Sequence, residues 1–254
     1  MKTALLHVAL SCSLCVAIAT SGFFDSVLVD LGYEHYAERP VSLLPACLAM
    51  PFNSLVNLGY VLLGVYWLRR GTENAGRGAY FKDVFALMAL VYGPIQWLRI
   101  ATQARRLAVL DQWFTLPIFA WVPIWCHYIA GGWSPRHVLV VEAASLCSYG
   151  LALSHDLGFE LALGCHVALA VTQGLRIQRR FGDSQSLACL AGAVLSCVGF
   201  VVLKLLDHRL AEQLWIFRHL SGHFCSKVCD VLQFHFSFLF LWRLTGREKQ
   251  GRSE

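Results

Sequence analysis

The sequence has little charge. Only 15% of its 254 residues are Asp, Glu, Lys or Arg, whereas 57% are hydrophobic. A soluble domain is about one quarter charged and roughly 45–50% apolar. This imbalance excludes intrinsic disorder, which requires low hydrophobicity and a high net charge. Together with a mean hydropathy of +0.54, it indicates a protein whose solvent is largely lipid.

Several other patterns are missing. The sequence has no glycine period and no heptad repeat, which excludes a collagen-like or coiled-coil rod. Strand-like alternation does not persist along the chain, which excludes a transmembrane barrel. The net charge of +5 is spread over loops rather than gathered on one basic face, so we expect no nucleic acid partner.

Ten cysteines are present, and their positions argue against a disulfide scaffold. All of them fall inside apolar runs: Cys12, Cys15, Cys47, Cys126, Cys147, Cys165, Cys189, Cys197, Cys225 and Cys229. Their spacings also lack the paired partners of a zinc finger. We therefore expect these cysteines to pack between helices as small hydrophobic side chains.

Eight apolar stretches can be marked, at residues 4–22, 44–68, 83–99, 107–130, 137–154, 158–175, 187–206 and 222–242. A spanning helix needs about 20 residues, and backbone in lipid must satisfy its own hydrogen bonds as helix. The sequence therefore predicts an all-α membrane protein. We expect a signal-anchor-like segment (1–22), a lumenal acidic loop (23–43), a seven-helix bundle (44–242) and a cytosolic tail (243–254).

The positive charges predict an orientation. If all eight stretches span, thirteen Lys and Arg residues lie on the side of the two termini and seven on the other, with Lys227 inside the last stretch. This bias places the C-terminus in the cytosol, in an endomembrane of the secretory pathway or the plasma membrane. Two interpretations of the first stretch stay open: Ala17-Ile18-Ala19 resembles a signal-peptidase site, whereas the apolar run continues to Phe24, as in an uncleaved anchor.

Ionisable and amide side chains inside apolar stretches mark candidate sites, because they are costly at membrane depth. His223, Lys227 and Asp230 are spaced to share one helix face. With this topology the stretches 44–68, 107–130 and 222–242 all begin at the lumenal face, so that Asn53, Asp111 and His223 lie at a similar depth. We expect one polar pocket formed by Asn53, Ser54, Asn57, Asp111, His223, Lys227 and Asp230. The alternative is structural: Lys227 pairs with Asp230, and the asparagines join helices.

One resemblance covers nearly the whole chain. It is carried by FDSVLVDLGYEHYAE (24–38), LAMPFNSLVNLGY (48–60), LDQWFTLPIFAW (110–121), GFVVLKLLDH (199–208) and GHFCSKVCDVLQFHF (222–236). These stretches resemble the transmembrane protein 187 family. The resemblance implies a multi-pass membrane topology but no mechanism.

A second, distant resemblance has chemical content. Three motifs resemble those of the membrane hydrolase superfamily that contains alkaline ceramidases and adiponectin/progestin-type receptors. They are Phe52-Asn53-Ser54, Leu110-Asp111-Gln112 near the start of the stretch 107–130, and the acidic Asp207 ahead of the last stretch. The resemblance implies a zinc ion, held by three histidines, that activates water to attack a lipid amide.

The ligand set that this superfamily requires is incomplete here. The stretch 83–99 ends in GPIQWLR, without a histidine, and the position four residues after His223 is Lys227, whose ammonium group cannot bind zinc. The pair His219 and His223 has the correct spacing and provides the remaining metal candidates.

We therefore expect a non-catalytic, hydrolase-like bundle. It binds a membrane lipid or a protein partner and has no cofactor. In this interpretation Lys227 forms an ion pair with Asp111 or Asp230 where the zinc ion would lie. One alternative is a zinc-dependent lipid amide hydrolase that uses His219, His223 and Asp111. Another is a transporter or channel, for which the sequence offers no inverted repeat.

Overall fold

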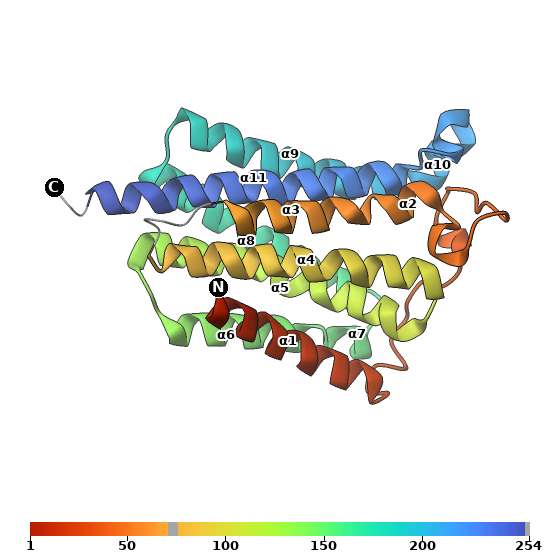
Figure 1. Ribbon diagram of the computed structural model, residues 1–254, viewed down its shortest axis with the longest axis horizontal. Helices are drawn as coiled ribbons and strands as arrows, with labels where there is room; N and C mark the ends of the chain where they lie inside the picture. The colour runs from red at the N-terminus through yellow and green to blue at the C-terminus, as the bar shows by residue number, and fades with distance from the viewer. Residues whose placement is uncertain (71–75, 252–254) are drawn as a thin grey trace.

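The chain is folded into helices that lie side by side, as the computed structural model in Figure 1 shows. The structure describes residues 1–70 and 76–251, with side chains up to residue 246, and this part contains no strand. The helices are α1 (Lys2–Thr20), α2 (Pro51–Leu55), α3 (Asn57–Arg69), α4 (Gly78–Thr102), α5 (Arg105–Gly131), α6 (Pro135–Ser148), α7 (Leu151–Ser154), α8 (Gly158–Phe181), α9 (Ser184–Leu205), α10 (Asp207–Gln213) and α11 (Gly222–Gly251). Three 3₁₀ turns lie at Tyr33–His35, Ala46–Leu48 and Trp215–Arg218.

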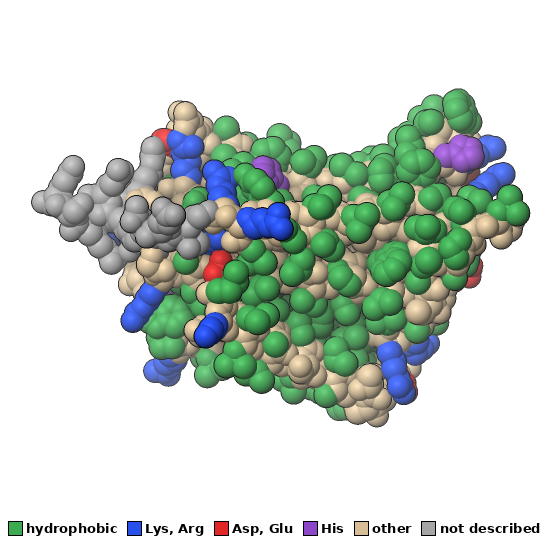
Figure 2. All heavy atoms as spheres, in the orientation of Figure 1, with side chains coloured by type: hydrophobic (Ala, Val, Ile, Leu, Met, Phe, Trp, Pro, Cys, Tyr) green, Lys and Arg blue, Asp and Glu red, His purple; other side chains and the backbone are tan. Residues whose placement is uncertain are grey.

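Seven of these elements are long and apolar enough to cross a membrane, within the described residues. They are α1, α4, α5, the α6–α7 segment, α8, α9 and α11 up to Gly246. Large aliphatic side chains such as Leu139 and Leu195 are about 70% exposed, which in water would be unfavourable. Figure 2 shows hydrophobic side chains over the middle of the molecule and Lys and Arg side chains at its two ends. The predicted all-α, multi-pass membrane fold is confirmed.

The predicted stretch 44–68 differs from the others because its helix is broken. The helices α2 and α3 meet at Val56. The side-chain amide of Asn57 donates to the backbone oxygens of Asn53 at 2.9 Å and Ser54 at 3.3 Å. A side chain that donates to these carbonyl oxygens competes with the regular backbone hydrogen bonds of the helix. The two short helices together cover residues 51–69, but neither is long enough to span alone.

The most buried helix is α5, against which α4, α6, α8 and α1 all pack. The helix α11 lies along α9, and α3 lies along α4. We call the end with Met1, Arg70 and the segments 76–77, 132–134 and 182–183 the terminal end. The opposite end, where the segments 21–50, 103–104, 155–157 and 206–221 gather, is the capped end (Figure 1). The helix α11 continues to Gly251, through most of the predicted tail.

The N-terminal helix α1 is held in the bundle by a polar cluster. His7 Nε2 lies 2.6 Å from Glu142 Oε1, and His7 Nδ1 lies 2.5 Å from the Tyr80 hydroxyl oxygen. The amino group of Met1 lies 3.2 Å from Asp83 Oδ2. Because the contacts of His7 and Met1 join α1 to α4 and α6, α1 is an integral part of this fold.

Candidate functional site

The loop 21–50 covers the capped end and is fixed there by two buried carboxylates. Asp207 accepts from the backbone N–H of Ala37 at 2.9 Å and of His223 at 3.0 Å, which ties the loop to the start of α11. Glu38 accepts from the backbone N–H groups of Phe52 at 2.9 Å and Asn53 at 2.8 Å. A carboxylate at a helix N-terminus satisfies unpaired N–H groups and complements the helix dipole. Burial nevertheless raises the pKa of Glu38.

A polar cavity of about 150 Å³ lies beneath this loop. Its lining comes from the loop and from α3, α4, α5, α8, α9 and α11, so that elements far apart in the sequence meet there. The lining residues are Asp30, His35, Tyr60, Tyr92, Gln96, Arg99, Asp111, Gln112, Thr115, Phe159, Glu160, Leu163, Phe200, Lys204, His223, Lys227 and Asp230. We call it the capped-end cavity.

The structure brings four of the predicted pocket residues into this cavity: Asp111, His223, Lys227 and Asp230. They come from α5 and from one face of α11, which matches the spacing that the sequence analysis used.

The three predicted residues of the broken helix lie outside the cavity lining. Asn53 donates to Glu38 Oε2 at 2.6 Å and to Ser221 Oγ at 3.1 Å, so it joins the loop to the start of α11. Asn57 Oδ1 lies 3.5 Å from Lys227 Nζ. Ser54 Oγ is buried without a hydrogen-bond partner.

The charges in the cavity are paired differently from the expectation. Asp111 forms an ion pair with Arg99 of α4, and their side chains are 12% and 13% exposed. Asp230 accepts from the Tyr60 hydroxyl at 2.6 Å. Lys227 donates to the amide oxygen of Gln96. Within the described residues no ion pair joins Lys227 to either carboxylate, so the expected pair with Asp111 or Asp230 is wrong: Arg99 and Tyr60 already occupy these carboxylates.

Sequence reasoning missed Arg99, which it counted only as a loop charge. A signal was present, because Arg99 closes one apolar stretch and Asp111 opens the next. The connection between α4 and α5 is only residues 103–104, and a short connection makes consecutive helices antiparallel neighbours. The facing ends of two such helices are the place where opposite charges meet.

The loop contributes Asp30 and His35 to the cavity lining, and the aromatic rings of His35 and Tyr36 pack against His223. The His35 ring lies 5.5 Å from the His223 ring, and the Tyr36 ring lies 4.6 Å from it. Burial lowers the pKa of His35 to about 4, and burial raises the pKa of Tyr36 to about 12. His35 Nδ1 lies 3.2 Å from Asp30 Oδ2.

Two polar atoms on cavity-lining residues are buried without a partner: Asp111 Oδ1 and His35 Nε2. Buried polar atoms in folded proteins are nearly always hydrogen-bonded, because an unpaired one costs about 1–3 kcal/mol. The cavity therefore has spare hydrogen-bonding capacity for a ligand or for water.

The residues present do not fit a catalytic zinc ion. Among the described residues no group of three or more His, Cys, Asp or Glu side chains is arranged to hold a metal. His219 is exposed in the turn before α11, outside the cavity lining. The residue four positions after His223 on α11 is Lys227, which lines the same cavity and whose ammonium group cannot bind a metal ion.

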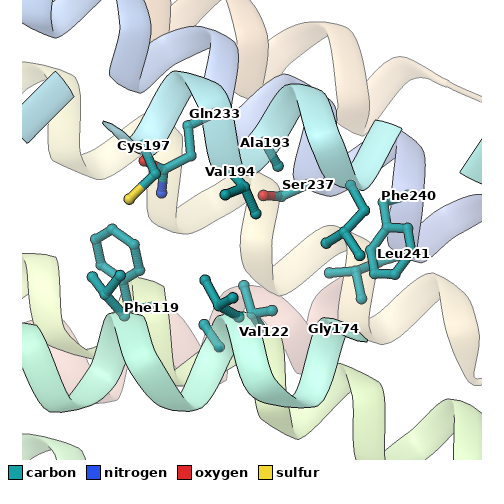
Figure 3. A pocket seen from close by; sticks show the side chains of 14 residues that line it. Phe119, Val122, Gly174, Ala193, Val194, Cys197, Gln233, Ser237, Phe240 and Leu241 are labelled. Carbon is teal, nitrogen blue, oxygen red and sulfur yellow. The ribbon is translucent and has the colours of Figure 1, made fainter. Parts of the chain in front are cut away.

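An apolar groove lies further along the same helices, toward the terminal end. It is narrow, about 50 Å³, and lies between α5, α8, α9 and α11. Figure 3 shows Cys197 and Gln233 at one end, Phe240 and Leu241 at the other, and Phe119 and Val122 across from them. Gln233 Oε1 is buried without a partner.

The cavity and the groove follow one another along the same helices. Phe119 lies one turn after Thr115 of the cavity on α5, and Val167 lies one turn after Leu163 on α8. The cavity residues Glu160 of α8 and Lys204 of α9 are exposed. The mouth of the cavity therefore lies between α8 and α9, the two helices that flank the groove.

The chain was compared with known proteins. The model of the TMEM187 protein family matches residues 4–242. Transmembrane protein 187 of Bos taurus is 62% identical over 248 residues, which are 95% of this chain and 96% of that protein. Transmembrane protein 187 of Homo sapiens is 61% identical over 239 residues, 94% of this chain and 91% of that protein. No solved structure matches the chain.

These matches confirm the first resemblance that the sequence carries. Neither they nor the geometry of the cavity support the second resemblance, to the ceramidase and adiponectin-receptor superfamily. With one family model covering residues 4–242 and two relatives above 60% identity over nearly their full lengths, the chain belongs to the TMEM187 protein family.

Proposed function

We propose that this protein is a non-catalytic membrane protein that binds a membrane lipid. The polar headgroup occupies the capped-end cavity, and a hydrocarbon chain lies in the groove between α8 and α9. The observation that supports this most directly is the order of the two sites: a polar cavity and an apolar groove follow one another along α5, α8, α9 and α11. An amphipathic ligand likewise has a polar part followed by an apolar part.

The cavity lining indicates the class of headgroup. Within the described residues, Lys204 and Glu160 at the mouth form no ion pair, and Asp111 Oδ1 lacks a hydrogen-bond donor. A headgroup with both donors and acceptors satisfies these groups together, as a hydroxyl-, amide- or zwitterion-bearing headgroup does. The mouth between α8 and α9 lets such a lipid enter sideways from the bilayer, while the loop 21–50 closes the cavity toward water.

Native mass spectrometry of the protein purified in mild detergent tests this proposal. We expect one lipid to remain bound to each chain. Ala193→Phe fills the groove, because Ala193 lines it and is only 8% exposed; lipid occupancy then falls at least about tenfold, which corresponds to 1.4 kcal/mol. Ala188→Phe is the matched control on α9, because Ala188 is exposed and outside the groove.

Four outcomes contradict the proposal. No co-purifying lipid, or equal occupancy in both phenylalanine variants, rules out the groove as a lipid site. Release of fatty acid from the bound lipid on incubation shows that the protein is catalytic. A protein that co-purifies at fixed stoichiometry in place of a lipid indicates that the partner is a polypeptide.

We propose further that the capped end faces the lumen and the terminal end the cytosol, in a membrane of the secretory pathway or the plasma membrane. The bias of thirteen to seven positive residues supports this orientation. Leu43 is 94% exposed in the loop, so the double change Leu43→Asn and Pro45→Ser creates an accessible glycosylation acceptor. We expect it to be glycosylated, and an acceptor appended after Glu254 to stay unmodified. The reverse result places the cavity on the cytosolic side.

A further inference from the structure

A second cavity lies at the terminal end, between α5, α6 and α8. Its volume is about 290 Å³. Four basic or titratable side chains from the three helices line it: His127 of α5, His137 of α6, and Arg176 and Arg180 of α8. The rings of His127 and His137 are stacked with their centroids 3.8 Å apart. We call this the basic cavity.

Among the described residues, no acidic side chain balances the charge in the basic cavity, because no Asp or Glu is part of its lining. Within the described residues the side chains of Arg176 and Arg180 form no ion pair or hydrogen bond, although Arg180 packs over the Phe181 ring at 5.0 Å. Both arginines are exposed. Two guanidinium groups on successive turns of one helix can grip one phosphate group, for which their planar donor geometry is suited.

The depth of the basic cavity matches the headgroup region of a bilayer. Arg176 lies five residues before the end of α8 and His127 four residues before the end of α5. At 1.5 Å per residue these side chains lie within about 8 Å of the helix ends. The remaining wall is apolar, from Pro123, Cys126, Val141, Leu169 and Ile177. Leu169 lies two turns deeper than Arg176 and is 43% exposed, so the cavity is open toward lipid chains.

We propose that the basic cavity binds the phosphate headgroup of an anionic phospholipid from the surrounding bilayer. Arg176 and Arg180 contact the phosphate, the two histidines border it, and an acyl chain lies against the wall around Leu169. Basic pockets between membrane helices are suited to acidic headgroups. This site is at the opposite end of the bundle from the capped-end cavity and does not depend on the lipid proposed there.

The test measures lipid binding by native mass spectrometry of the full chain, titrated with phosphatidylserine or phosphatidylcholine. We expect phosphatidylserine to bind more tightly than phosphatidylcholine. The double variant Arg176→Gln/Arg180→Gln is expected to weaken phosphatidylserine binding about 25-fold, from roughly fivefold for each arginine. Arg179→Gln removes one positive charge from the same part of α8 but outside the cavity lining. We expect it to change binding less than twofold, compared with roughly fivefold for either single change Arg176→Gln or Arg180→Gln.

Further arms separate the alternatives. If the double variant does not fold, Ala130→Phe fills the cavity without a change of charge. We expect it to weaken the binding of phosphatidylserine but not that of phosphatidylcholine. Equal binding of the two lipids, or equal loss in the Arg179→Gln control, overturns the proposal. Inorganic phosphate at millimolar concentration is the soluble probe: a thermal stabilisation by phosphate that the double variant abolishes identifies a soluble anion as the ligand and also overturns it.

Discussion

Replacing Arg99 with methionine is expected to destabilise the protein much more than the same replacement of Lys227, although both cations line the capped-end cavity. Arg99 is the counter-ion of Asp111, and both side chains are almost enclosed. Removing one partner of a buried ion pair costs about 3–5 kcal/mol, because it leaves a charge uncompensated. Within the described residues Asp111 Oδ1 lacks a hydrogen-bond partner, and Lys204 and Lys227, which line the same cavity, form no ion pair with Asp111 that would replace the guanidinium group.

Lys227 is in a different position. It donates to the amide oxygen of Gln96 and lies 3.5 Å from that of Asn57, and both of these acceptors are neutral. Lys227→Met loses these hydrogen bonds, at about 1–3 kcal/mol for an acceptor left unpaired. It also removes the desolvation cost of a buried ammonium group, which is of similar or greater size. The two contributions nearly cancel, and we expect a net change within about 1 kcal/mol.

Thermal unfolding in one detergent distinguishes the two variants. At roughly 2–4 °C per kcal/mol for a chain of this size, Arg99→Met lowers the midpoint by about 6–20 °C and Lys227→Met changes it by less than about 4 °C. The double variant Arg99→Met/Asp111→Leu is the control, because it removes both charges and is expected to recover most of the loss. Equal losses for Lys227→Met and Arg99→Met refute this reasoning and identify Lys227 as the counter-ion of Asp111.

Two further predictions concern α1 and the loop 21–50. His7→Leu leaves the Glu142 carboxylate unpaired inside the bundle and is expected to cost about 3 kcal/mol of stability. In the same thermal assay, the double variant His7→Leu/Glu142→Leu is expected to restore this loss. Cleavage after Ala19 would also leave Glu142 unpaired, so intact-mass spectrometry should find residues 1–19 retained. For His35, the pKa of about 4 lies below the usual 6.5, so its contribution to stability is present above pH 6.5 and falls as the pH drops toward 4, by about 3 kcal/mol in total. The thermal midpoint should fall more between pH 7.5 and pH 5 in the wild type than in His35→Gln, and parallel curves exclude this role.

The helical fold was predictable from the sequence because lipid leaves a chain few options. Each apolar stretch needs an internally hydrogen-bonded backbone. Several stretches became helices close to their expected bounds, for example α5 at Arg105–Gly131 for the stretch 107–130. In other stretches a bound differs more: the helices of 44–68 begin only at Pro51, and the helix of 222–242 continues to Gly251. Helical spacing likewise predicted that His223, Lys227 and Asp230 share one face. The break at Val56 was not predictable, because it depends on which carbonyl groups the Asn57 side chain takes.

The partners of the charged groups were harder to predict than their positions. A face of α11 tells which residues point inward, but the partner of Asp230 comes from α3, and that of Asp111 comes from α4. Glu38 and Asp207 cap helices from segments well separated in the sequence. Such contacts depend on how the loop 21–50 folds over the bundle, and hydrophobic periodicity carries no information about a loop.

The carboxylates inside the bundle differ in how fully they are satisfied. Glu142 contacts both His7 and Ser11, and Glu38 accepts three hydrogen bonds. These carboxylates join elements and leave little capacity for a ligand. Within the described residues, Asp111 Oδ1 and His35 Nε2 are buried without partners on cavity-lining residues, and further such atoms lie outside the cavity on Asn53, Ser54, Trp67 and Gln233. A partly satisfied buried network is less stable than a packed hydrophobic one. An unpaired atom therefore does not mark a ligand site by itself, and the lipid proposal depends on the combination of Asp111 and His35 with a cavity that meets an apolar groove along the same helices.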